Sequence, residues 1–216
     1  MHLRTMSVCA FLLALPVGSA AAAPVRLGAP PGSTGVHRAH SASSNCPVWS
    51  GGTGILADGD FSEAPDPGTG LPTFHRGAVF APDWTVTGDT IDLYGSTAWG
   101  PDTGYCSVDL DGTPGPGGIR HTAFATKSGQ PYTVTFLLSG NGACGPTVKT
   151  MSIIAARQFT TFTWDISNGN DAQHGVWLPE SWVFKAHGPN TILQFKSKDS
   201  PGNCGPVVAA ISVTPS

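Results

Sequence analysis

Hydrophobic and polar residues alternate along much of this chain. In segment 132–139, one face carries Tyr132, Val134, Phe136 and Leu138, and threonine and serine dominate the other face. A period of two is typical of a half-buried β-strand, whereas a helix would repeat its apolar positions every three or four residues. This segment is therefore predicted to be a strand.

Short segments of this kind recur about every dozen residues, with Gly, Pro and Asn between them. The whole chain of 216 residues has 28 Gly, 19 Pro and only 12% charged residues, which favours turns over long helices. We predict one all-β domain, a jelly-roll-like antiparallel β-sandwich, in which residues 64–81 form a loop. The expected strands are 83–87, 90–94, 107–110, 119–124, 132–139, 149–155, 159–164, 182–186, 191–197 and 207–213.

The N-terminal part of the chain has a different composition. Arg4 precedes an apolar stretch at 6–17, and Ala21-Ala22-Ala23 follows, so residues 1–23 are predicted to be a signal peptide. The apolar stretch is shorter than the roughly 20 residues that span a bilayer. No second apolar span follows, which predicts an exported protein, secreted or periplasmic, without membrane contact after cleavage.

Residues 24–54 are rich in Pro, Gly, Ser and Ala and show no periodicity. Such composition is typical of a linker. The predicted organisation is therefore signal peptide 1–23, linker 24–54 and sandwich domain 55–216.

The predicted mature chain keeps four cysteines, Cys46, Cys106, Cys144 and Cys204. An even number in an exported chain indicates two disulfides, and three pairings are possible. Cys144 and Cys204 are each followed by Gly-Pro in similar turns, which favours a bond between them and leaves Cys46 to pair with Cys106. Metal ligation or a catalytic thiol is disfavoured, since no C-x-x-C spacing occurs.

The charge of the chain limits its partners. Its formal net charge is −3 and Lys plus Arg total 11, so we expect no nucleic-acid partner, which would need a basic surface. The sequence carries no signal for an oligomeric state.

Two acidic pairs, Asp58 with Asp60 and Asp109 with Asp111, have the residue type that glycoside hydrolysis requires. Asp-Gly is also common turn chemistry, because Asp accepts backbone hydrogen bonds and Gly tolerates positive φ, and we prefer that interpretation. The chain has no G-x-S-x-G, no H-E-x-x-H and no phosphate-binding glycine loop. No residue is therefore assigned a catalytic role.

Aromatic residues in loops are the stronger functional signal. A sugar ring stacks on an exposed aromatic ring while neighbouring polar groups bind its hydroxyls. Trp84, Trp164 and Trp182 fall in predicted strands and are expected in the core. A loop aromatic can instead fold down over the end of the sandwich. The candidate ligand-binding residues are Trp99, Asp102, Tyr105, Asn141, His174 and Trp177.

Several short motifs follow one another over residues 55–214. They are DGDF at 58–61, DWTV at 83–86, SVDLDG at 107–112, GQPYTVTF at 129–136, WVFKA at 182–186 and CGP at 204–206. Their order and spacing resemble the bacterial choice-of-anchor C proteins, which are similar to a plant cell-wall family, domain of unknown function 642. The resemblance implies a galactose-binding-like jelly roll that is extracellular, with a carbohydrate or cell-wall role and no established catalytic residues.

Many galactose-binding-like modules hold a structural calcium ion, which needs six to eight oxygen ligands. The resemblance makes Asp60 and Glu63 weak candidates for such a site. Ala209 and Ala210 stand where the family usually carries an acidic residue, which makes a structural calcium ion doubtful, and no other cofactor is expected.

These observations favour a secreted, non-catalytic carbohydrate-binding or cell-surface module whose partner is a polysaccharide or a cell-wall glycan. Two alternatives stay open. One is a secreted carbohydrate-active enzyme, a glycoside hydrolase or lyase, with acids drawn from its loops. The other is a structural adhesion or matrix protein without a small ligand.

Overall fold

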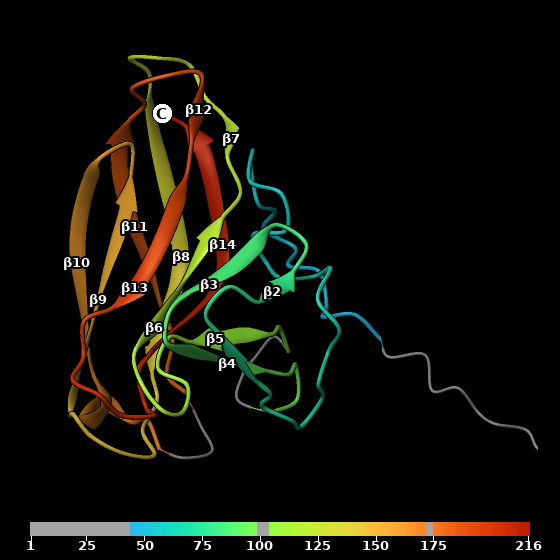
Figure 1. The fold of residues 1–216 in the computed structure, drawn as a ribbon, viewed down its shortest axis with the longest axis vertical. Coiled ribbons are helices and arrows are strands. Elements are labelled where there is room, and N and C mark those ends of the chain that lie inside the picture. Colours follow the sequence, from blue (N-terminus) through green and yellow to red (C-terminus); the bar gives the residue numbers. More distant parts are fainter. Residues whose placement is uncertain (1–43, 99–103, 172–174) are drawn as a thin grey trace, which may run out of the picture. The chain divides into compact units, whose positions relative to one another are not determined.

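The computed structural model describes residues 44–98, 104–171 and 175–216. These residues form two six-stranded antiparallel sheets that pack face to face, as the sequence predicted for the fold class (Figure 1). The first sheet has the order β1-β4-β5-β14-β8-β11, the second has the order β10-β9-β13-β6-β3-β2, and β7 and β12 form a small separate pair. The strands are β1 (Thr73–His75), β2 (Val79–Ala81), β3 (Trp84–Gly88), β4 (Thr90–Tyr94), β5 (Ser107–Asp109), β6 (Gly117–His121), β7 (Phe124–Ala125), β8 (Pro131–Gly140), β9 (Val148–Ala155), β10 (Gln158–Asp165), β11 (Leu178–Lys185), β12 (Asn190–Thr191), β13 (Leu193–Ser197) and β14 (Pro206–Pro215).

Strand β8 confirms the alternation that the sequence showed. Tyr132, Val134, Phe136 and Leu138 are all buried, and the residues between them are half-buried. The buried face points into the sandwich, and the backbone pairs with β11 on one side and β14 on the other. The period of two therefore places β8 inside its sheet with one face on the core.

Aromatic rings from both sheets form the centre of the core. Phe136 of the first sheet meets Phe195 of the second edge to face, with ring centroids 5.4 Å apart, and Trp84 packs beside Phe195. Trp84 and Trp164 are buried as predicted, and Trp182 is half-buried on the edge strand β11, where it packs against the core.

The chain crosses repeatedly between the two sheets, for example from β3 to β4, from β8 to β9 and from β13 to β14. This jelly-roll-like path makes strands that are distant in sequence into neighbours. Strand β14 lies between β5 and β8, so the residues around 109, 141 and 205 meet at one end of the sandwich. That end is at the bottom of Figure 1.

The loop predicted at residues 64–81 is partly wrong, because it contains β1 and β2. Each has three residues and lies at the edge of a sheet, and a segment of three residues is too short to establish an alternation. Two predicted strands are each divided: segment 119–124 falls in β6 and β7, and segment 191–197 in β12 and β13. The described part of the chain has one short 3-10 helix, Ile166–Asn168, and no helix that is long and apolar enough to cross a membrane.

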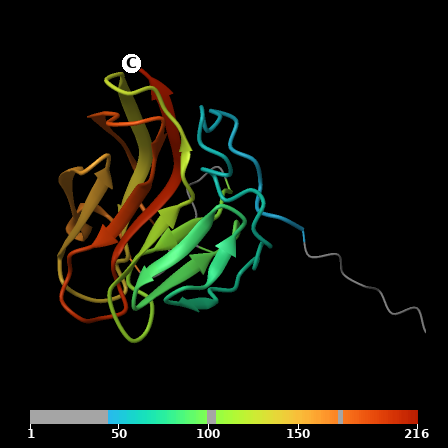
Figure 2. The ribbon, with the colours of Figure 1, turned by 45° about the horizontal axis from the view of Figure 1, so that its top comes forward.

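Residues 44–54, which composition assigned to the linker, are held against the folded unit. Cys46 N donates to Ala64 O (2.9 Å), and Gly54 forms a parallel bridge with Val213 of β14. In Figures 1 and 2 this segment runs along one side of the sandwich beside the strands coloured green and red. The sequence of this segment shows no periodicity, and it gives no sign of such isolated backbone hydrogen bonds. Thr53 also accepts a hydrogen bond from Val213 N (3.1 Å), so the end of this segment pairs with β14 along its backbone edge.

Candidate functional site

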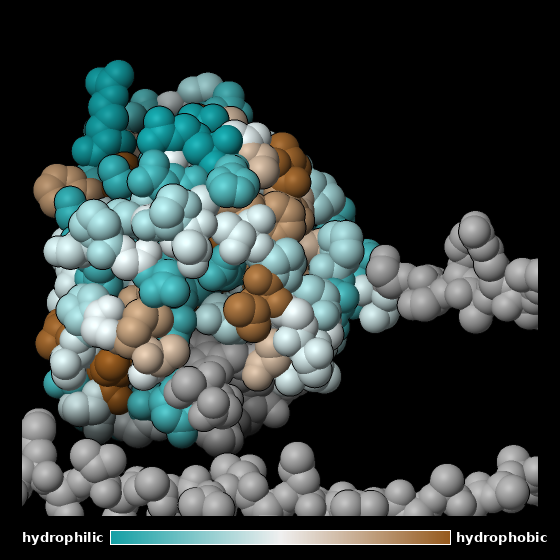
Figure 3. All heavy atoms as spheres, turned by 60° about the horizontal axis from the view of Figure 1, so that its bottom comes forward, coloured by the Kyte–Doolittle hydropathy of each residue, from teal (hydrophilic) through white to brown (hydrophobic). Residues whose placement is uncertain are grey.

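A polar pocket of about 330 Å³ lies at the end of the sandwich where β8 ends and β14 begins. Its wall combines strand residues of β1 and β4 with residues from the loops after β5 and β8 and before β14. Figure 3 looks toward this end, where hydrophobic residues occur in small separate patches between polar ones. The lining residues are Leu71, Thr73, Asp92, Tyr94, Thr113, Asn141, Ala143, Asn203 and Cys204.

Strand pairing sets the polar side of the pocket. The register of β1 and β4 places Thr73 opposite Asp92, and Thr73 Oγ1 donates a hydrogen bond to Asp92 Oδ1. Burial raises the pKa of Asp92, although the bond from Thr73 works in the opposite direction. Tyr94 follows two residues later and therefore lies on the same face of β4. A hydroxyl, a carboxyl group and a phenol ring are thus arranged side by side.

Asn141 holds Tyr94 in place. Its Nδ2 donates to Tyr94 Oη (3.0 Å) and to Asp109 Oδ2 (2.9 Å), and its Oδ1 accepts from Ala143 N (2.9 Å). Both amide hydrogens are thus used within the protein, which leaves one lone pair of Oδ1 for a ligand. The candidate Asn141 therefore lies in the pocket wall, where its main effect is to orient the ring.

The other candidates in the described part of the chain, Trp177 and Tyr105, do not line this pocket. Trp177 is half-buried and packs with Ala98 against Tyr94 and Val207, so it supports the aromatic wall from behind. Tyr105 is half-buried next to Cys106 and is not among the described lining residues. Trp99, Asp102 and His174 lie outside the described residues.

Sequence reasoning missed Asp92, Tyr94, Thr73 and Asn203. Segment 90–94 was predicted correctly as a strand, and all five of its residues are buried. Burying a carboxyl group costs free energy unless it has hydrogen-bonding partners. An acidic residue in the middle of a predicted strand, such as Asp92, could therefore have been recognised as a candidate from the sequence. Asn203 carries no such signal, because an exposed loop amide is ordinary.

A buried carboxyl group lies behind the pocket. Asp109 is 0% exposed, and its Oδ1 accepts from Asp111 N (2.9 Å) and Gly205 N (3.0 Å). Burial raises the pKa of Asp109 to about 8, against the hydrogen bonds from Asp111 and Asn141 that lower it. A Cβ at Gly205 would lie 2.7 Å from Asp111 Cγ, so only glycine fits there. The carboxyl group of Asp109 therefore joins the loops at Asp111 and Gly205, and both acids of the pair are buried and do not line the pocket.

Lys149 ties together the two loops that flank the pocket. Its side chain is 0% exposed, and Nζ donates to Cys144 O (2.7 Å) and Cys204 O (2.6 Å). The same two cysteines form a disulfide with a Cα–Cα distance of 5.7 Å. Burial lowers the pKa of Lys149, and the neighbouring carboxyl groups oppose this shift, Asp199 most strongly. An ammonium group and a covalent bond thus fix the same loop pair.

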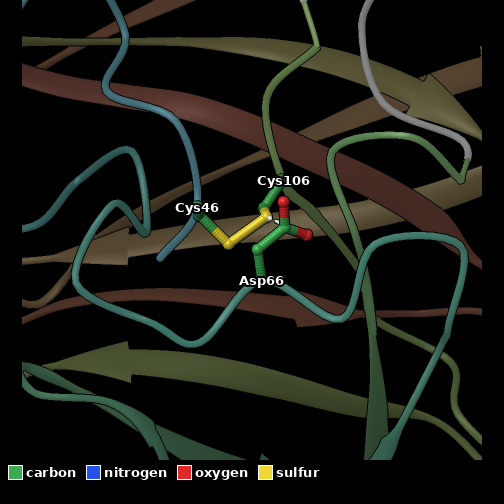
Figure 4. Close-up of side chains that lie close together, drawn as sticks. All are labelled: Cys46, Asp66 and Cys106. Carbon is green, nitrogen blue, oxygen red and sulfur yellow. Dashed lines mark hydrogen bonds between the residues drawn. A yellow bond between two sulfur atoms is a disulfide. The ribbon is translucent and has the colours of Figure 1, made fainter. Parts of the chain in front are cut away.

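The second disulfide joins Cys46 to Cys106, so the structure has the two pairs that the turn sequences favoured. Asp66 lies beside this bond, with Oδ1 3.7 Å from Cys106 Sγ (Figure 4). Both sulfurs are bonded to each other, so these three residues offer no thiolate to a metal. Asp66 instead accepts bonds from the backbone N of Ser96 (3.0 Å) and from Ser96 Oγ (2.5 Å). Partial burial opposes ionisation of Asp66, but the hydrogen bonds from Ser96 and Gly68 lower its pKa.

The turn at Asp58–Glu63 contains the calcium candidates. It lies against a bulge of β14, where Ile211 N donates to Gly59 O (2.9 Å), so Ala209 and Ala210 are close to it. Asp60 uses its two oxygens to accept from Trp49 N (2.8 Å) and Ser62 N (3.3 Å).

Other oxygens of this turn are also occupied. Asp58 Oδ1 accepts from Glu63 N (2.9 Å), and the Asp58 carbonyl accepts from Trp84 Nε1 (2.8 Å). Asp58 Oδ2 is buried without a hydrogen bond, and burial raises the pKa of this carboxyl group to about 6. Within the described residues, the acids of this turn do not converge as a metal-binding group of three.

Residues 54–214 match the family described as "Protein of unknown function (DUF642)". The chain belongs to this family. No curated protein sequence is significantly similar to this DUF642 chain.

Three solved structures resemble the DUF642 chain. A native family 35 carbohydrate-binding module from Clostridium thermocellum is 20% identical with a TM-score of 0.43, and the match covers 66% of this chain and 97% of that module. CBM35 from Paenibacillus barcinonensis is 16% identical with a TM-score of 0.42, over 67% and 99% of the two chains. TmCBM61, solved in complex with β-1,4-galactotriose, is 12% identical with a TM-score of 0.45, over 76% and 100%. At these identities the similarity concerns the fold alone.

Proposed function

We propose that this DUF642 chain is a secreted, non-catalytic carbohydrate-binding module that acts at a cell surface or cell wall. The observation that carries the proposal is the pocket in which Thr73, Asp92 and Tyr94 lie side by side. A sugar ring offers an apolar face for an aromatic ring and hydroxyls for neighbouring polar groups. The pocket, at about 330 Å³, is near the lower end of known ligand sites and suits one sugar unit of a longer glycan.

The carboxyl groups favour binding over hydrolysis. Glycosidases place two carboxyl groups about 5 to 9.5 Å apart on either side of the scissile bond. Among the described lining residues, Asp92 is the single acid. The acidic pair Asp109 and Asp111 is buried behind the wall of the pocket.

Two features support export and the placement within the family. The two disulfides are stable in an oxidising compartment, such as the cell exterior or the periplasm. The signal-like segment 1–23 agrees with this location. Within the DUF642 family, we place the chain beside the bacterial choice-of-anchor C proteins because the order of its motifs from Asp58 to Pro206 resembles theirs.

Calorimetric titration against a panel of neutral oligosaccharides tests the proposal. We expect dissociation constants between millimolar and micromolar, or about −4 to −8 kcal/mol. Ala143→Trp fills the pocket from an exposed position and should abolish binding. Asn203→Ala removes a polar rim group whose Oδ1 lies 3.3 Å from Cys144 Sγ, a disulfide sulfur with no proton to donate, and should weaken binding severalfold.

Ser181→Ala, on β11 outside the pocket, is the matched control and should bind like the unaltered protein. Unchanged affinity of the Ala143→Trp variant would show that the sugar binds outside this pocket. Absence of binding to every oligosaccharide of the panel would contradict the proposal and favour an adhesion or matrix protein without a small ligand.

A further inference from the structure

The second sheet presents an outer face that the pocket does not use. Its strands alternate between core residues and this face, so Ile153, Phe195 and Ile119 point inward while their neighbours Ile154, Gln194 and Arg120 point outward.

Strand register aligns the outward residues in two rows that cross the sheet. The first row continues on both sides to the edge residues Phe159, which is 74% exposed, and Val79, which is 62% exposed. With a spacing of about 4.8 Å between strands, the five gaps from β10 to β2 make a row of about 24 Å. The first row is Phe159, Ile154, Gln194, Arg120, Thr85 and Val79, and the second is Thr161, Ser152, Lys196, Gly118 and Thr87.

Two hollows lie along these rows. One, of about 580 Å³, is lined by Ile154 and Gln194 together with Arg157 and His187 from the adjoining turns and Asn190 of β12. The other, of about 480 Å³, lies over β3 and β6 and is lined by Arg76, Thr85, Thr87, Arg120 and Lys196. Gln194 of the first hollow and Arg120 of the second are register partners. The two hollows therefore adjoin across the middle of the face.

Gly118 of β6 is a buried glycine in the second row. It lies between Lys196 and Thr87, and a Cβ there would come within 2.4 Å of Phe195 O. The polar groups nearby are hydroxyls and amides, and Gln194 Nε2 already donates to Thr87 Oγ1 (3.0 Å).

The charges on this face have one sign. Arg120, Arg157 and Lys196 are exposed, and none makes a side-chain hydrogen bond or an ion pair with the described residues. Arg76, at the rim, is the exception and pairs with Asp89 (3.4 Å). In the described part of the chain, no carboxyl group lines either hollow. This is notable in a chain whose formal net charge is −3.

We propose that this basic face, defined by Arg120, Lys196 and Arg157 on the outer side of the second sheet, binds an anionic polysaccharide. The inference rests on the proposed glycan binding and adds a second surface and a chemical class to it. The carboxylate groups of the polysaccharide pair with the three cations, the hydroxyls meet Thr85, Thr87 and Gln194, and the apolar sugar faces lie on Ile154. Charge complementarity favours this occupant over a neutral glycan.

The test uses polygalacturonate and its methyl ester, which have the same backbone and differ in charge. The intact chain should bind polygalacturonate, lose affinity as salt is raised, and bind the methyl ester much more weakly. Arg120→Gln with Lys196→Gln should reduce affinity for polygalacturonate by roughly two- to thirtyfold, the range that two exposed charge pairs supply. Lys127→Gln with Lys185→Gln removes the same charge from exposed positions outside both hollows and should leave affinity unchanged.

Each other outcome overturns the inference in a distinguishable way. Equal binding of the methyl ester, or an equal loss in the control variant, would show that this face does not recognise carboxylates. Binding of neutral oligosaccharides without binding of polygalacturonate would overturn the basic face and leave the proposed function standing. Equally tight binding of a single-stranded oligonucleotide, with the same loss in the variant, would reassign the face to unspecific polyanion binding. Failure to bind any glycan would overturn both proposals.

Discussion

Lys149 is a charged residue in a place where charge is costly. Its ammonium group is fully buried, yet two backbone carbonyl groups accept its hydrogen bonds and three carboxyl groups lie nearby. A buried charge of this kind is tolerated only when its partners are in place. The side chain therefore acts as a fixed internal connector between the loops at Cys144 and Cys204.

Lys149→Met should lower the free energy of unfolding by about 3 to 5 kcal/mol, because it leaves the neighbouring acids without a compensating charge and the two carbonyl groups without a donor. Urea unfolding followed by fluorescence measures the change. Lys127→Met, at an exposed position, should alter stability by no more than about 0.5 kcal/mol. A loss below about 1 kcal/mol for Lys149→Met would show that water replaces the ammonium group.

Single residues also show where sequence reasoning is limited. The alternation in β8 identified its buried side chains, since a period of two depends only on neighbours in sequence. The pocket residues Asp92 and Asn203 come from segments more than a hundred residues apart. Their meeting depends on strand order, which a single sequence does not specify.

At the level of elements, strand β14 brings most of the site together. It lies between β5 and β8 and begins at the Cys204-Gly205-Pro206 turn, whose glycine contacts the acids of β5 and of the loop that follows. The repeated Cys-Gly-Pro sequences were enough to favour the pairing of Cys144 with Cys204, which the fold confirms. The short edge strands β1 and β2 could not be predicted in this way, because three residues do not establish a period.

Replacing both Cys144 and Cys204 by Ser should reduce stability while the native fold is retained. The bond closes a sequence separation of 60 residues, for which the chain-entropy model gives about 4 kcal/mol. Lys149 still holds the two loops in the folded state, so circular dichroism should remain native-like while the melting temperature falls. Non-reducing peptide mapping checks the pairing, and a linkage of Cys106 to Cys144 would contradict it.

The double variant Cys46→Ser with Cys106→Ser is compared with the Cys144 and Cys204 double variant by its melting temperature. This disulfide and the Asp66–Ser96 hydrogen bonds fix the chain on either side of residues 97–105. We expect the two double variants to lose the same free energy of unfolding, since both disulfides close the same sequence separation.

At the scale of the whole molecule, charge is distributed unevenly. Buried acids gather behind the pocket and at the Asp58–Glu63 turn, while exposed cations occupy the outer face of the second sheet. Composition alone gave the formal net charge, on which the expectation of no generally basic surface rests. It could not reveal a local basic face, because the sign of a face depends on which strands share it.

Calcium should contribute little to the stability of the whole domain. The oxygens of the Asp58–Glu63 turn are largely used by backbone donors, and Ala209 and Ala210 supply no carboxylate. We expect melting curves with and without a chelator to differ by less than about 2 °C. A tight site at a hundredfold excess of calcium would add about 2.7 kcal/mol, which corresponds to roughly 5 to 10 °C for a domain of this size. A shift of that size would show that other oxygens complete a site.

The length of β8 determines how the protein can be attached to a surface. Ser216 N donates to Pro131 O (3.1 Å) at one end of this strand, whereas Asn141 follows Gly140 at the other end. Ten extended residues separate these ends by about 33 Å. A biosensor chip or a bead that captures the protein by a tag after Ser216 would therefore leave the polar pocket directed toward the solution, free of steric interference from the support.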